Sequence, residues 1–320
     1  MNRFYAVFMV LGILGGCTSP PQRYALGGER EIVVFYTRDL DPVLSSIDSA
    51  INLRVYTPQP DSLYHFRPVV PDSYDTYKGY KNILVLTCEE CENYELFSSI
   101  IDGRSGLMTA RGVYSPDDYV VILSAQNRED LLYFLGSYYA RMDSLLRERI
   151  YELYKRRAYY VGRNKKMEEK VKQKYGLEME IPLGWYILKG TDVQDSILFL
   201  GKHNPDRFFF VYKTKYRYPL DIETLFQLRE RIASVYYPGD YLLREYVVPD
   251  RVYGLEKGLC FYSVWQNDEE VAGGPVKTCA YYDGDYFVMY DIAVFAPRKE
   301  DKLQYILRAE TIIRTLKIID

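Results

Sequence analysis

Two cysteines separated by two residues are the part of the sequence best suited to chemistry. Cys88 and Cys91 follow an apolar run that predicts a buried strand, and the residues after them predict a helix. A cysteine pair at the start of a helix can carry out thiol–disulfide exchange, because the exposed backbone amides stabilise a thiolate. Both intervening residues are glutamates, however, and their charge disfavours a thiolate. We therefore expect a structural or idle disulfide, with a thiol oxidoreductase as the alternative.

Two further cysteines, Cys260 and Cys279, fall in alternating apolar runs that predict neighbouring strands. A disulfide across these strands is one expectation, but spacing alone leaves the pairing of the four cysteines open. The two histidines, His65 and His203, stand in no metal-ligand spacing and beside no evident nucleophile. Because a second closely spaced ligand pair is missing, we expect neither a metal nor a cofactor.

The remaining motifs carry no catalytic signature. The sequence GRSG at residues 103–106 lacks the Gly-x-Ser-x-Gly order of a nucleophile elbow. No phosphate-binding glycine loop occurs, and the acidic pair Asp117-Asp118 fits a turn before a strand better than a glycosidase site. We therefore expect no catalytic residue and no enzyme activity apart from the thiol alternative.

The fifth cysteine, Cys17, ends a segment with the order of an export signal. Arg3 lies in a short polar start, and apolar residues then run from 4 to 14. Such a run makes a helix of about 16 Å, roughly half the hydrocarbon thickness of a bilayer, so it is too short to span a membrane. The sequence LGGC at residues 14–17 resembles the bacterial lipobox, in which the thiol is diacylated. We expect a signal peptide over residues 1–16 and lipidation of Cys17; an ordinary cleavage site and a core helix are the other interpretations.

The residues after the lipobox indicate which membrane holds the protein. Thr18 follows the cysteine, in place of the aspartate associated with inner-membrane retention, and no acidic run for surface export occurs. Two or three acyl chains would anchor the chain essentially permanently, since each buried methylene contributes about 0.8 kcal/mol. We therefore expect a lipoprotein on the outer membrane that faces the periplasm.

The composition narrows the classes of partner. Removal of residues 1–16 removes one arginine and no acid, so the net charge changes from −3 to −4. An acidic balance argues against a nucleic-acid-binding protein. The chain is unusually rich in tyrosine, with 34 residues. Tyrosine suits half-buried strands, so we interpret this richness as sheet packing, with a sugar-stacking surface as the alternative.

The first part of the mature chain predicts a tether followed by a small α/β domain. A Pro-Pro pair and a Gly-Gly pair indicate a tether over residues 17–30. Strands and helices then alternate over residues 31–155 and end in a long helix that Asn127 caps. Four prolines in residues 57–78 predict a loop with short extended pieces. The other expected elements are strands at 31–36, 82–87 and 119–124, and helices at 42–51 (capped by Asp41) and 92–101.

A basic stretch over residues 156–176 separates the two expected domains. Nine basic and two acidic residues lie between residues 155 and 174. We expect a helix end or an interdomain linker whose charges face solvent. A patch that binds anionic lipid or cell-wall polymer is the alternative.

The apolar period changes to two over residues 177–320, which predicts an α+β domain with one antiparallel sheet. A helix capped by Asp221 and a C-terminal helix from about Lys299 pack on it, and Asp283-Gly284 predicts a hairpin. We interpret Gly273-Gly274-Pro275 as a turn or bulge between two strands, with a binding loop as the alternative. The outline resembles the PsbP/Mog1-type layout. The expected strands lie at 177–188, 196–201, 207–216, 258–265, 275–282 and 285–295.

Four segments carry a resemblance to a known family. They are GGEREIVVF (27–35), IPLGWYI (181–187), KGLCFYSVW with VAGGPVKT (257–278), and VFAPRKEDKLQYILRAETIIRTL (294–316). With the lipobox, they resemble an uncharacterised group of bacterial lipoproteins, domain-of-unknown-function family 4837, over most of the mature chain. The family pattern has Met, Phe and Trp where this chain has Ala272, Val276 and Cys260. The resemblance implies no established activity or catalytic residue.

Three hypotheses of function follow. The first is a lipid-anchored protein of the cell envelope that binds or scaffolds a partner, either an envelope protein or a cell-wall polymer, without catalysis. The second is a periplasmic thiol oxidoreductase that uses Cys88 and Cys91. The third is a glycan-binding lipoprotein that uses exposed tyrosines.

Overall fold

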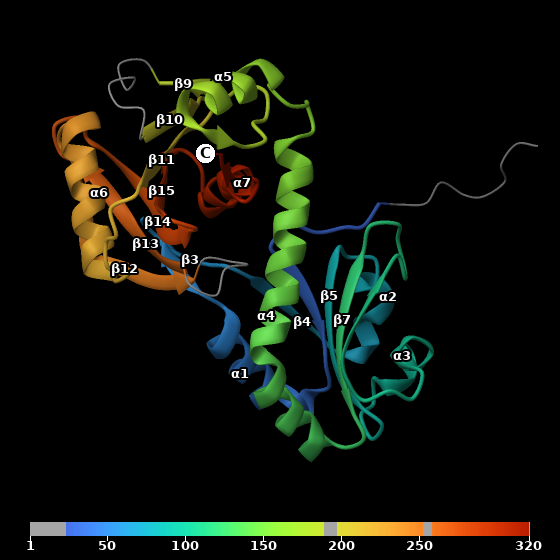
Figure 1. Cartoon of the computed structure of the whole chain (residues 1–320). Helices are drawn as coiled ribbons and strands as arrows, with labels where there is room; N and C mark the ends of the chain where they lie inside the picture. The colour runs from blue at the N-terminus through green and yellow to red at the C-terminus, as the bar shows by residue number, and fades with distance from the viewer. Residues whose placement is uncertain (1–23, 189–196, 252–257, 320) are drawn as a thin grey trace, which may run out of the picture.

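Two β-sheets, each covered by helices, lie on either side of one long helix (Figure 1). The computed structural model describes residues 24–188, 197–251 and 258–319. The predicted signal peptide, Cys17 and the start of the tether lie outside the described residues. We call residues 24–127 the first lobe and the described part of residues 159–319 the second lobe.

The first sheet has the strand order β4-β1-β5-β7-β6. Its first four strands are parallel, and β6 runs antiparallel to β7. Every residue of β5 and β7 is buried, because helices cover both faces of the sheet. α1 and the long helix α4 pack on one face, and α2 and α3 on the other. The elements are β1 (Glu31–Phe35), α1 (Asp41–Ile51), β4 (His65–Val69), α2 (Tyr74–Tyr77), β5 (Asn82–Cys88), α3 (Tyr94–Ile101), β6 (Gly106–Arg111) and β7 (Tyr119–Ala125).

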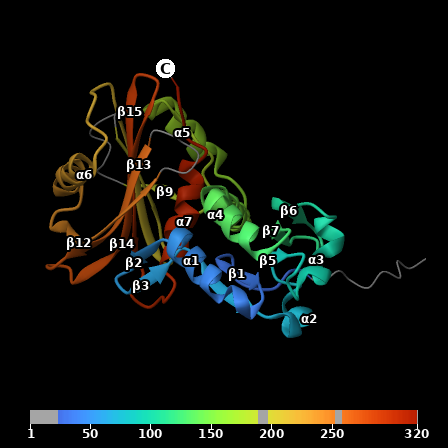
Figure 2. The same cartoon turned by 90° about the horizontal axis from the view of Figure 1, so that it is seen from below.

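The second sheet is antiparallel throughout and has the order β12-β13-β14-β15-β11-β10-β9. α6 covers one face and α7 the other, as Figure 2 shows. This arrangement confirms the expected antiparallel sheet packed by two helices. The elements are β9 (Tyr186–Ile187), β10 (Ile197–Lys202), β11 (Asp206–Thr214), α6 (Ile222–Tyr236), β12 (Asp240–Arg251), β13 (Gly258–Asn267), β14 (Ala272–Asp283), β15 (Tyr286–Phe295) and α7 (Leu303–Ile313).

The long helix α4 (Arg128–Ala158) joins the two lobes. Its N-cap is the predicted Asn127, whose side chain accepts a hydrogen bond from the Asp130 backbone N–H at 2.9 Å. α4 packs on β5 and β7 of the first sheet and on α7 of the second lobe. Apolar residues of both lobes therefore form one continuous core along α4.

Two other local predictions are confirmed. The Asp221 side chain caps α6 and accepts from the Thr224 N–H at 2.7 Å. β14 and β15 form the expected two-residue hairpin; because Asp283 pairs with Tyr286, its loop is Gly284-Asp285, one residue later than the Asp283-Gly284 signal. Asp41, by contrast, is the first residue of α1, and the N-cap position belongs to Leu40.

Residues 25–30 lie against the first sheet, whereas the sequence predicts them as the end of a tether. The Leu26 N–H donates to the Gly79 carbonyl, and the Lys81 N–H donates to the Leu26 carbonyl, each at 2.8 Å. Arg30 is buried and pairs with Asp61 at 3.3 Å. These hydrogen bonds and this ion pair hold residues 25–30 in place. The proline and glycine content of the segment did not predict such contacts.

The basic stretch contains the expected helix end, but a second helix takes the place of an interdomain linker. Residues 156–176 form the last turn of α4, a short connection and a second helix, α5 (Lys165–Tyr175). Val171 and Tyr175 bury the apolar face of α5, and Arg163 pairs with Glu168 at 2.8 Å and with Glu180 at 2.7 Å. Helical spacing of a few apolar residues therefore decides the structure here despite the high charge.

Several strands are not predicted by the pattern of the sequence. β12 forms one edge of the second sheet, although charged residues and Pro249 interrupt its apolar pattern; proline is tolerated at a sheet edge. β4 and β6 form the two edges of the first sheet. Of the strand expected at 177–188, only β8 (Leu177–Glu178) and β9 form; β8 pairs with β16 (Lys317–Ile318). A small hairpin of β2 (Arg54–Tyr56) and β3 (Pro60–Ser62) also lies within the expected loop.

The Gly273-Gly274-Pro275 element lies inside β14 and is neither a turn nor a binding loop. Gly274 and Pro275 are buried and pair with Trp265 and Val264 of β13. A Cβ atom on Gly274 would collide with the carbonyl oxygen of Val294, which explains why a glycine is needed. The indole N–H of Trp265 donates to that same carbonyl at 3.3 Å, next to the end of the β14–β15 ladder.

We predict that Gly274→Ala destabilises the fold by at least about 2 kcal/mol, because β14 and β15 must separate to admit the added methyl group. Urea unfolding measures the change. The matched control is Gly136→Ala in α4, where no atom lies near the added Cβ and the helix gains roughly 0.5–1 kcal/mol. Equal stability of Gly274→Ala and the wild type would contradict this packing.

Candidate functional site

A cleft of about 740 Å³ lies where the two lobes meet. We call it the interlobe cleft. The end of α1 and the residues that follow it form one wall, α4 forms the floor and the last residues of β12 form the other wall. Its main lining residues are Asn52, Leu53, Arg54, Tyr139, Ala140, Asp143, Arg147, Val248, Pro249, Asp250 and Arg251.

Buried charges form the base of this cleft, beginning at Asp143 on α4. Its carboxylate accepts hydrogen bonds from Arg147 Nε at 3.0 Å and from Tyr64 Oη at 2.6 Å. Arg251 also donates to it, at 2.5 Å. Arg147 Nη1 donates to Asp250 on β12 at 3.1 Å. Two ion pairs therefore join the floor of the cleft, on α4, to its wall on β12.

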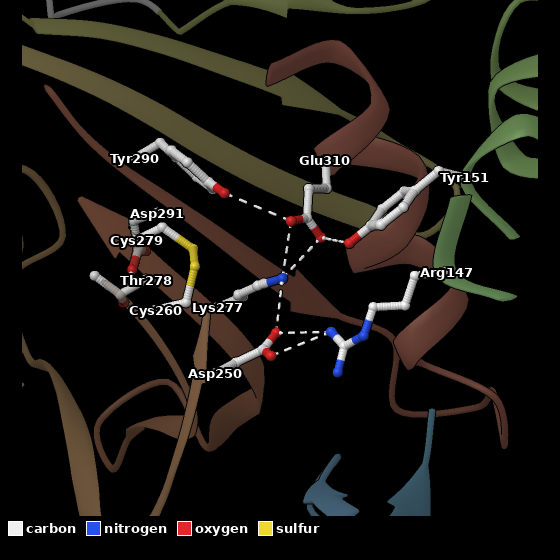
Figure 3. The surroundings of a disulfide bond; sticks show 10 residues. All are labelled: Arg147, Tyr151, Asp250, Cys260, Lys277, Thr278, Cys279, Tyr290, Asp291 and Glu310. Atoms are coloured by element: carbon white, nitrogen blue, oxygen red, sulfur yellow. Dashed lines mark hydrogen bonds and ion pairs between the residues drawn. A yellow bond between two sulfur atoms is a disulfide. The ribbon is translucent and has the colours of Figure 1, made fainter. Parts of the chain in front are cut away.

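The charges continue beneath Asp250 into the second lobe (Figure 3). Lys277 Nζ, on β14, lies 3.3 Å from Asp250 Oδ2 and donates to Glu310 Oε1 at 2.8 Å. Glu310 belongs to α7 and accepts a hydrogen bond from Tyr151 Oη of α4 at 2.6 Å. Tyr290 Oη lies 3.5 Å from the same carboxylate. We call the connected set the charge network: Asp143, Arg147, Asp250, Lys277 and Glu310.

The pairing offsets the cost of burying these charges. Burial alone lowers the pKa of Lys277, but the nearby Glu310 carboxylate raises it well above the ordinary value of a lysine. Burial alone raises the pKa of Asp250, but Lys277 and Arg147 hold it below its ordinary value. Both groups therefore stay charged at neutral pH. Lys277, which is fully buried, is then no nucleophile, and Asp250 is a weak base.

The structure places the two cysteine pairs far apart in the fold. Cys260 and Cys279 form a disulfide between β13 and β14, on the sheet face that also bears Lys277 (Figure 3). Cys88 and Cys91 form a second disulfide at the end of β5 in the first lobe. Cys88 and Cys91 are both buried.

The histidines lie outside the interlobe cleft, and each makes a local contact with a carboxylate. His65 lies 3.4 Å from Asp61, and His203 lies 2.7 Å from Asp206. Within the described part of the chain, no group of three or more histidine, cysteine or carboxylate side chains is placed to hold a metal ion. No helix among residues 24–188, 197–251 and 258–319 is long and apolar enough to cross a membrane.

The charge network was not found from the sequence. Lys277 and Glu310 occupy apolar runs of a strand and a helix, where a single charged residue normally faces solvent. The alternation of side chains along the strand could have revealed Lys277. It lies on the same strand face as Cys279 and Tyr281, which are both buried. Lys277 and Glu310 are 33 residues apart along the chain, and Arg147 and Asp250 are 103 residues apart. No local spacing in the sequence therefore connects the members of either pair.

We predict that Asp250→Asn lowers the free energy of unfolding by about 3–5 kcal/mol at pH 7, because it removes one carboxylate from two buried cations. The pKa of Asp250 is depressed in the folded state, so its stabilisation is present above the unfolded pKa of about 3.9 and is lost as the pH falls below it. The difference in the free energy of unfolding between the variant and the wild type should therefore become smaller below about pH 4. Urea unfolding from pH 7 to pH 3 measures this difference.

The matched control for this variant is Asp285→Asn. Asp285 is exposed in the β14–β15 turn, and its loss should change stability by less than about 0.5 kcal/mol. A pH-independent gap, or an Asp250→Asn protein as stable as the wild type at pH 7, would contradict the role of the network.

Comparisons with solved structures find a partial likeness to two proteins. The Ran-binding protein Mog1p of Saccharomyces cerevisiae is 11% identical, with a TM-score of 0.34, over 45% of this chain and 91% of that chain. The PsbP protein CyanoP of Synechocystis sp. PCC 6803 is 9% identical, with a TM-score of 0.30, over 45% of this chain and 88% of that chain. No curated protein matches the sequence.

A protein-family comparison matches the second lobe. Residues 164–315 fit the family described as "Domain of unknown function (DUF4837)". The matched range runs from the N-cap of α5 to the end of α7 and contains Asp250, Lys277 and Glu310. It does not reach residues 27–35, on which the sequence resemblance also depended. Over residues 164–315, just under half of the chain, the sequence is therefore similar to the domain of unknown function DUF4837.

Proposed function

We propose that this chain is a lipid-anchored protein of the cell envelope that binds a partner in the interlobe cleft without catalysing a reaction. The observation that carries the proposal is the cleft itself, an open groove of about 740 Å³ whose charged base is fully paired. Paired charges provide a rigid surface for binding and leave no reactive group poised for catalysis.

The proposed site of anchoring is Cys17. The LGGC sequence at residues 14–17 and the apolar run before it support lipidation and removal of residues 1–16. The two disulfides are compatible with an oxidising compartment such as the periplasm, because disulfides persist there and are rare in the cytosol. Thr18 after the cysteine supports the outer membrane, with the protein facing the periplasm.

The partner that fits the cleft is a segment of another envelope protein. Arg54 and Arg251 are exposed at the two rims, and Tyr139 and Val248 offer apolar contact between them. This mixture of exposed guanidinium and aromatic groups is typical of protein interfaces. The net charge of −4 for the mature chain disfavours a nucleic acid.

Two alternatives have weaker support. Thiol–disulfide exchange needs an accessible sulfur, and both Cys88 and Cys91 are buried. Binding of a glycan needs aromatic rings gathered on one surface. The most exposed tyrosines, however, come from four separate segments of the chain: Tyr24, Tyr133, Tyr160 and Tyr216.

We predict that a photoreactive p-benzoylphenylalanine in place of Tyr139 captures one envelope protein in intact cells, because Tyr139 lines the interlobe cleft. The matched control carries the same group in place of Tyr160, which is 90% exposed and lies outside the cleft. Mass spectrometry identifies the crosslinked product. Identical products from both positions, or none from Tyr139, would overturn the cleft as the binding site.

A Cys17→Ser variant of the Tyr139 protein tests the anchor in the same cells. Without the acceptor thiol, the chain should leave the membrane fraction and the specific crosslink should fall strongly. Mass spectrometry of the unmutated protein should find an acylated N-terminal peptide beginning at Cys17. Capture of cell-wall fragments at Tyr139 would favour the glycan alternative.

A further inference from the structure

A second cavity, separate from the interlobe cleft, lies on the α6 face of the second sheet. It encloses about 220 Å³ between the end of α6 and the strands β11, β13, β14 and β15. We propose that this cavity binds a small apolar molecule that carries an ammonium group next to a hydrogen-bond acceptor. We call it the α6 pocket; its principal lining residues are Phe208, Phe210, Arg229, Tyr237, Trp265 and Asp291.

The α6 pocket exists because small side chains occupy the sheet where the helix has already ended. α6 ends at Tyr236, and Tyr237, the residue after it, lines the pocket. Ala272 and Ala293 form part of the sheet surface there, while Phe208 and Trp265 supply larger aromatic walls. A volume of about 220 Å³ is several times the roughly 30 Å³ that one water molecule occupies in the liquid. The space therefore suits a small organic molecule better than a single water.

Two buried polar atoms at this pocket have no hydrogen-bond partner among the described residues. One is Nε of Arg229, a side chain that is only 2% exposed. It lies 3.7 Å from Asp291 Oδ1, beyond hydrogen-bond distance. The other is Oη of Tyr237. Buried donors are nearly always satisfied in folded proteins, so a ligand oxygen that accepts from these atoms would complete the site.

The charges around the pocket favour a cation. Three acids, Asp240, Glu270 and Asp291, line it together with the single cation of Arg229. Burial raises the pKa of Asp291 above its ordinary value, although Arg229 lowers it in part. A bound ammonium would stabilise this carboxylate, whereas a bound anion would be repelled by all three acids.

The aromatic walls reinforce this choice. Ammonium groups are attracted to the faces of tryptophan, tyrosine and phenylalanine, which Trp265, Tyr237 and Phe208 supply here. The full pattern is thus an ammonium near Asp291, an acceptor oxygen near Arg229 Nε and an apolar body on the rings. An amino-acid amide, or the first residue of a peptide with a free amino group, contains all three features.

Four probes of similar size test the pattern by isothermal titration calorimetry on the full-length protein in detergent. Phenylalaninamide has the ammonium, the carbonyl and the ring; 2-phenylethylamine lacks the carbonyl; 2-phenylethanol lacks the charge; phenylacetate carries the opposite charge. We expect phenylalaninamide to bind most tightly and phenylacetate at least about tenfold more weakly than 2-phenylethylamine. Equal affinities, preference for phenylacetate, or no binding of the two amines would overturn the proposal.

Two variants link this binding to the α6 pocket. Ala272→Leu places a larger side chain in the pocket lining and should weaken phenylalaninamide at least about tenfold. Its control is Val271→Leu, at a neighbouring position that is 89% exposed and outside the lining. Tyr237→Phe removes a hydroxyl that has no hydrogen-bond partner among the described residues, so it should weaken binding several-fold while the melting temperature stays the same.

Unchanged affinity in Ala272→Leu, with the Tyr237→Phe protein also unaffected, would place the amine elsewhere and overturn the assignment. A loss of affinity in Val271→Leu equal to that in Ala272→Leu would do the same. Because neither variant touches the interlobe cleft, these outcomes are independent of the crosslinking at Tyr139.

Discussion

A single buried ammonium group, that of Lys277, lies at the centre of the polar contacts that join α4 to the second lobe. It lies at no measurable exposure inside the second lobe and cannot remain charged there without carboxylates. Glu310 of α7 and Asp250 of β12 provide them, at 2.8 Å and 3.3 Å. α4 then supplies Arg147 to Asp250 and Tyr151 to Glu310. α4, on which the first lobe packs, is therefore joined to the second lobe through the two carboxylates that pair with Lys277.

This constraint explains the interlobe cleft. A charge network of this kind adds little net stability compared with apolar side chains of the same size, because burying the ions costs about as much as their attraction returns. It does restrict the arrangement, since a shift of α4 along its axis would leave Asp250 or Glu310 without one of its partners. The floor of the cleft on α4 and its wall on β12 are held in a fixed arrangement as a result. A binding surface that is set in advance loses less conformational freedom when a partner arrives.

Local patterns in the sequence predicted much of the fold. The caps at Asn127 and Asp221, the hairpin between β14 and β15 and the buried strands β5 and β7 all follow from short-range rules. Edge strands were missed, because one side of an edge strand faces solvent and its apolar pattern weakens, as in β12. Gly274 was wrongly predicted to lie in a turn or bulge. A glycine is required there because the neighbouring strand β15 approaches closely, and not because the backbone turns.

The site was harder to predict for a related reason. The charge network and the α6 pocket both join side chains from elements that are distant in the chain, and their charged members look like ordinary surface charges in the sequence. Asp291, for example, sits in an apolar strand with Thr278 as its hydrogen-bond donor on the neighbouring strand. Only the register of the antiparallel sheet brings such pairs together.

The most direct test of the account is native-state amide hydrogen exchange across both sheets of the wild-type protein. If the charge network and the shared core join the lobes into one unit, the slowest amides of β5 and β7 should exchange with the same opening free energy as those of β13 and β14. A first sheet that opens at a distinctly lower free energy, while the second sheet stays protected, would show that the lobes fold independently and would contradict the account.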